Sequence, residues 1–85
     1  MEKTPIEQLR ELMPDVRNNE LCKAEVIDIE GIVKSYNTMD SEQRNFMVKY
    51  EGKYFGDLAE GEYYESHPKA QKILRKVAGL VKRMV

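Results

Sequence analysis

The C-terminal stretch from Ser66 onward constrains the fold of this 85-residue chain more than any other segment. Its apolar side chains recur at the spacing of one helical face, and lysines and arginines occupy the opposite face. The apolar set is Ala70, Ile73, Leu74, Val77, Leu80, Val81 and Met84. The sequence therefore predicts a helix that is capped by Ser66, has Pro68 near its start and buries one face.

Charge is divided unevenly along the chain. Residues 67–85 carry six lysines and arginines and no acid, whereas residues 1–66 carry all 15 acidic residues. A basic end of this kind can bind an anion, or its charges can simply keep one helix face in water. Charge alone leaves both interpretations open.

A second helix is predicted at the N-terminus. Thr4 can cap it, Pro5 suits the first helical position and Glu7 follows the cap by three residues. Its apolar face comprises Ile6, Leu9, Leu12 and Met13. Pro14 is expected to end this helix, because the residue before a proline is disfavoured in helical conformation.

The middle of the chain predicts a β-sheet, because β-branched and aromatic residues are frequent there. The predicted strands are residues 22–36 with a bulge near Gly31, residues 46–50 after a polar loop, and a short run from Tyr54 after a turn at 51–53. Their connections are too short for parallel crossovers. The expected fold class is thus α+β, ordered α-β-β-β-α, with two helices packed on one face of a three-stranded antiparallel sheet in a single domain, residues 1–85.

Few residues in the chain could carry catalysis. With one histidine and one cysteine, neither a nucleophilic triad nor a zinc site can be assembled. Cys22 is expected to be a buried apolar residue of an intracellular protein, cytoplasmic or nuclear. No apolar run approaches the roughly 20 residues of a membrane helix. We therefore expect a non-catalytic protein without metal, cofactor or membrane contact.

Three short motifs occur in the order of the predicted elements. They are Pro5-x-x-x-Leu9-x-Glu11, then Phe46-x-Val48-x-Tyr50-x-Gly52-Lys53, then Ser66 followed by Lys69, Ala70 and Lys72. Together with the element order, they resemble the double-stranded RNA-binding domain. Residues 4–14 look most like the C-terminal domain of this kind in Dicer-type ribonuclease III enzymes.

The resemblance implies sequence-independent binding of duplex RNA by an accessory domain of a Dicer-like RNA-processing enzyme, as in RNA interference. The first helix would meet minor-groove hydroxyls, and the N-terminus of the last helix would meet phosphates. The implied RNA-binding residues are Thr4, Gln8, Arg10, Glu11, Lys53, His67, Lys69, Lys72 and Lys76.

The chain also departs from the family pattern. The family's Gly-Pro-x-His loop has no counterpart in residues 40–44, and His67 and Pro68 stand where the family has paired lysines. An alternative is therefore a module of the same fold that binds protein through a sheet edge or the last helix. The missing loop and the acidity of the chain favour protein, whereas the basic helix face favours RNA.

Overall fold

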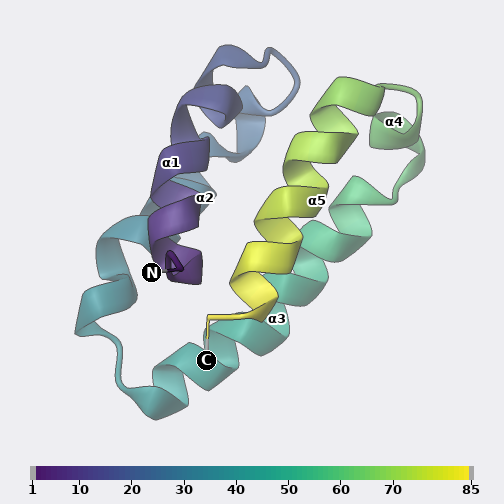
Figure 1. Ribbon diagram of the computed structural model, residues 1–85. Coiled ribbons are helices and arrows are strands. Elements are labelled where there is room, and N and C mark those ends of the chain that lie inside the picture. Colours follow the sequence, from purple (N-terminus) through teal and green to yellow (C-terminus); the bar gives the residue numbers. More distant parts are fainter. Residues whose placement is uncertain (1, 85) are drawn as a thin grey trace.

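The computed structural model describes residues 2–84, and these residues form helices and no β-strand (Figure 1). The elements are α1 (Pro5–Asn18), α2 (Val26–Ser35), α3 (Ser41–Ala59), α4 (Glu62–Glu65) and α5 (Pro68–Lys82), with short 3-10 turns η1 (Lys23–Glu25) and η2 (Tyr36–Thr38). The expected α-β-β-β-α fold is therefore wrong. Residues 23–36 of the first predicted strand lie in η1, α2 and the start of η2, and the other two predicted strands lie in α3.

Helix α5 lies at the centre of the packing. It runs along α3 and also contacts α1, so that the three helices enclose the core (Figure 1). The predicted apolar face is confirmed: all its members are buried except Ile73, which is half-buried. The predicted cap is wrong, because His67 occupies the cap position while the hydroxyl of Ser66 donates to the carbonyl of Tyr63 at 3.0 Å.

Helix α1 begins as predicted but continues past the expected stop. The Thr4 hydroxyl accepts the backbone N–H of Glu7 at 3.3 Å, and the four predicted apolar residues are buried. Pro14 lies inside the helix, although an internal proline costs about 3 kcal/mol. The turn beyond it buries Val16 completely and pairs Arg17 with Glu30 of α2 at 2.8 Å. Tertiary contacts thus hold a turn that local preference would end.

The β-branched stretch forms α2 because its buried positions follow a helical spacing. Ile29 and Ile32 are buried, and Val26, Val33 and Tyr36 are partly buried beside them. These positions are three or four residues apart, as one helical face requires. Low helix propensity costs β-branched residues only tenths of a kcal/mol each, which burial outweighs.

The first residues of helix α3 were predicted as part of a polar loop, and its middle contains the predicted turn at 51–53. The Asp40 carboxylate accepts the N–H of Gln43 at 2.8 Å, and the Gln43 side chain accepts the N–H of Asp40 at 2.9 Å, which forms a capping box. Gly52 is a site of close approach rather than a turn. A Cβ atom there would lie 2.9 Å from Cγ of Lys82 on α5.

This geometry predicts opposite behaviour for two helical glycines. A Cβ atom at Gly79 would meet nothing within 4 Å, so Gly79→Ala should raise the free energy of unfolding by about 0.5–1 kcal/mol. Gly52→Ala should gain less or destabilise, because the Lys82 side chain must move. Urea denaturation followed by circular dichroism measures both. Equal gains would contradict the close approach of α3 and α5.

Candidate functional site

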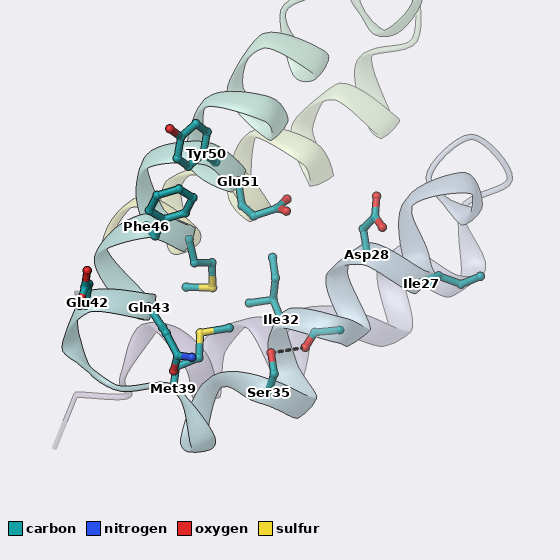
Figure 2. A pocket seen from close by; sticks show the side chains of 12 residues that line it. Ile27, Asp28, Ile32, Ser35, Met39, Glu42, Gln43, Phe46, Tyr50 and Glu51 are labelled. Carbon is teal, nitrogen blue, oxygen red and sulfur yellow. Dashed lines mark hydrogen bonds between the residues drawn. The ribbon is translucent and has the colours of Figure 1, made fainter.

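An open groove of about 760 Å³ lies between α2 and α3 (Figure 2). Helix α2 packs chiefly on α1 and α3 on α5, so the two walls diverge from the connection at η2. Ile32 and Met47 are buried and Met39 is partly buried along its inner side. The inner side of the groove is therefore apolar. The groove is closed near Met39, where its two walls join, and open at its other end.

Exposed aromatic side chains follow the α3 wall. Phe46 and Tyr50 are 62% and 52% exposed, and their ring centroids lie 4.4 Å apart. Tyr54, one further turn along, is 44% exposed. Phe46 precedes the core residue Phe55 by nine positions, which places it on the opposite side of the helix. Helix α3 is thus apolar on two sides, and α5 covers only one of them.

Carboxylates gather at the open end of the groove. Asp28 of α2 and Glu51 of α3 point toward this end from opposite walls (Figure 2). Beside them Glu25 is only 8% exposed and accepts a hydrogen bond from the Tyr54 hydroxyl at 2.5 Å. We call Glu25, Asp28 and Glu51 the acidic end. No ion pair within residues 2–84 involves any of the three.

The electrostatics of the acidic end favour the arrival of a positive charge. Burial, followed by the nearby charges of Asp28 and Glu25, raises the pKa of Glu51. The hydrogen bond to Glu25 is the main cause that raises the pKa of Tyr54 to about 12. The negative charge of Glu51 is thus held in a partly desolvated place beside like charges, which a bound cation would relieve.

The RNA-binding residues predicted on α1 are partly engaged in local contacts. Thr4 caps the helix, the Gln8 amide donates to the carbonyl of Lys3 at 2.9 Å, and Glu11 forms an ion pair with Lys3. Arg10 is exposed. Thr4, Gln8 and Glu11 thus support the start of α1.

Two further predicted residues lie apart from each other. Lys53, on α3, pairs with Asp57 at 2.7 Å, and this hydrogen bond raises the pKa of Lys53. His67 is exposed at the cap position of α5, where its ring centroid is 5.3 Å from that of Tyr63. Neither residue lines the groove.

Three predicted residues do come together. Lys69, Lys72 and Lys76 line a shallow hollow of about 360 Å³ between α5 and the end of α1, along with Asp15 and Asn18. All three lysines are exposed, and the ion pairs within residues 2–84 include none of them. These three of the nine predicted RNA-binding residues thus share one hollow.

The groove residues were not identified from the sequence. Phe46 and Tyr50 were assigned to a strand, and Glu51 to a turn. A signal for them was present: aromatic residues recur at intervals of four from Phe46 to Tyr54, directly after the Asp40-x-x-Gln43 capping pattern. Read together, these patterns favour one long helix with an aromatic stripe.

Comparisons with protein-family models, curated proteins and solved structures found no match for this chain. Within residues 2–84, no group of three or more His, Cys, Asp or Glu could hold a metal ion. No helix in that range is long and apolar enough to cross a membrane. Cys22 is fully buried, as expected, and burial raises the pKa of its thiol.

The raised pKa of Glu51 predicts a pH-dependent effect of Glu51→Gln on stability. The folded state binds a proton at Glu51 more readily than the unfolded state, so this carboxylate destabilises the fold at neutral pH. Glu51→Gln should raise the free energy of unfolding at pH 7. The gain should shrink as pH falls through the folded pKa and vanish below the unfolded value of about 4.5. Glu65→Gln, which removes an exposed charge outside the groove, is the control. A gain independent of pH would rule out titration of Glu51 as its cause.

Proposed function

We propose that this domain is a non-catalytic interaction module that holds an apolar segment of another protein in the groove between α2 and α3. One observation carries the proposal: the exposed aromatic stripe of Phe46, Tyr50 and Tyr54 lies beside the apolar inner side of the groove. Contiguous apolar surface of this kind marks an interaction site more often than scattered apolar side chains do.

The exposed side chains can supply useful binding energy. Ile27, at 83%, is the most exposed large apolar residue, and it lines the groove with Phe46 and Tyr50. Complete burial of one such side chain stabilises by about 1.5–3 kcal/mol. Three of them provide several kcal/mol toward the roughly 8 kcal/mol of a micromolar complex. Aromatic residues near an interface centre commonly supply much of the affinity.

The shape of the groove favours a helical occupant. Its α2 wall has ten residues, or about 15 Å of helix. Two diverging helices with an apolar floor resemble the helix-in-groove mode of recognition. Pairing with an extended peptide needs a sheet edge, and residues 2–84 contain no strand. We therefore propose that a protein binds at this groove rather than at a sheet edge.

Selection from a displayed library of helical peptides tests this proposal. A selected peptide should shift the amide resonances of α2 and α3. The double variant Phe46→Ala with Tyr50→Ala should weaken its binding tenfold or more, equivalent to about 1.4 kcal/mol or more. Tyr63→Ala removes a ring that is 58% exposed outside the groove, and it should leave binding unchanged. The proposal would be refuted if the selected peptides bound the Phe46→Ala, Tyr50→Ala double variant as tightly as the unaltered protein. It would also be refuted if they shifted only amide resonances outside α2 and α3.

A second candidate function is the binding of duplex RNA through Lys69, Lys72 and Lys76, as the resemblance implies. The observation in its favour is their clustering without ion pairs near the N-terminal half of α5. The dipole of a helix N-terminus adds to the attraction of phosphate. An accessory role in a larger RNA-processing enzyme rests on this same cluster. Residues 2–84 contain no strand of the sheet that the resemblance implied, so charge is the main support for this candidate.

Matched charge removals at the two ends of α5 test the RNA candidate. Lys69→Ala with Lys72→Ala should weaken binding of a short RNA duplex by about 1 kcal/mol or more and flatten the salt dependence by about one to two units. Arg83→Ala, at the far end of α5, should do much less. Equal losses per charge would indicate diffuse attraction. Unchanged amide resonances at low salt would remove the candidate.

A further inference from the structure

The lining of the groove is one-sided in charge. It contains three carboxylates, Asp28, Glu42 and Glu51, and no lysine or arginine. Lys49, which precedes Tyr50 on α3, places its ammonium over the Tyr50 ring at 5.7 Å from the centroid and does not line the groove. The acidic end therefore lacks a counter-charge within the groove itself.

We infer, on the basis of the proposed function, that the occupant is an amphipathic helix of another protein that places an arginine or lysine between Asp28 and Glu51. Its apolar face covers Phe46 and Tyr50 and fills the groove toward Met39. Its basic residue lies at the open end, where the two carboxylates face the groove from opposite walls (Figure 2).

Desolvation explains why a neutral or acidic helix fits less well. Any occupant that covers the groove removes water from Glu51, which is already half-buried, and from Asp28. An uncompensated buried carboxylate is costly, and pairing with hydrogen bonds offsets much of that cost. Arginine suits the place best, because its planar fork can donate to both carboxylates while its stem packs on the Tyr50 ring.

The length of the α3 wall sets how far the basic residue of the occupant lies from its apolar anchors. Gln43, at the closed end, and Glu51, at the open end, are eight residues apart on α3, or about 12 Å. The occupant therefore needs apolar anchors over about two helical turns, with the basic residue one turn beyond them at the open end.

Other occupants of this groove fit less well. Anionic membrane surfaces and nucleic acids carry the same sign of charge as the acidic end. A second copy of this chain would have to offer its basic helix α5, but the apolar face of α5 is buried against α3 and α1. No exposed apolar anchors would then accompany the lysines of α5.

Three synthetic helical peptides with the same leucine face test the inference. They differ only at two positions next to the apolar anchors. Both positions are arginine in the first peptide, glutamine in the second and glutamate in the third. We expect the arginine peptide to bind about tenfold or more tighter than the glutamine peptide, and the glutamate peptide to bind most weakly. Added salt should weaken binding of the arginine peptide more than binding of the other two.

Variants of the protein show which carboxylates cause the preference for the arginine peptide. Glu51→Gln and Asp28→Asn should each reduce the preference for the arginine peptide over the glutamine peptide. Glu65→Gln, an equal charge change outside the groove, should leave that preference intact. The double variant Phe46→Ala with Tyr50→Ala should weaken all three peptides, which shows that charge and the aromatic stripe act at the same site.

The outcomes separate the inference from the proposed function. Equal affinities of all three peptides, with amide shifts in α2 and α3, would overturn the inference and leave the groove as a binding site. An arginine preference that survives in Glu51→Gln and Asp28→Asn would also overturn it. If no peptide shifts the groove resonances, both the inference and the proposed function fall.

Discussion

The lengthwise packing of α5 on α3 is the contact on which the rest of this structure depends. Leu74, Val77 and Val81 of α5 and Phe55 of α3 are completely buried in the core that these helices share with α1. Gly52 lets the two helices approach at Lys82. Because this contact uses one side of α3 and α1 holds α2, the opposite side of α3 faces a gap rather than another helix. The candidate groove is thus a direct consequence of how the core is built.

The groove and the lysine cluster carry opposite charges on different surfaces. Carboxylates surround the open end between α2 and α3, whereas Lys69, Lys72 and Lys76 lie against the end of α1. This separation explains how a chain of net charge −1 can offer a strongly acidic place and a strongly basic one. At the acidic end, Glu25 is buried and Glu51 is half-buried, so water screens these two charges less than it screens exposed ones. The lysines are exposed, so their effect is more sensitive to salt.

Sequence reasoning located the two terminal helices and failed in the middle. The start of α1 and the buried face of α5 were predicted because capping residues and helical spacing act locally. The β-branched and aromatic composition of residues 22–36 and 46–50 predicts strands, whereas their apolar spacing predicts helices. The spacing of Val26, Ile29 and Val33 was helical throughout. The candidate groove could not be predicted, since its two walls are defined only once α2 and α3 are helices.

By itself, the sequence determined the capped start of α1, the apolar and basic faces of α5 and the charge difference between residues 1–66 and 67–85. These are properties of neighbouring residues on one helix. Only the tertiary structure decided that α1 continues through Pro14, that Gly52 marks a helix contact, and that Asp28 and Glu51 face one groove. Each of these depends on side chains far apart in the chain, because burial against another helix can outweigh a local preference of about 1–3 kcal/mol.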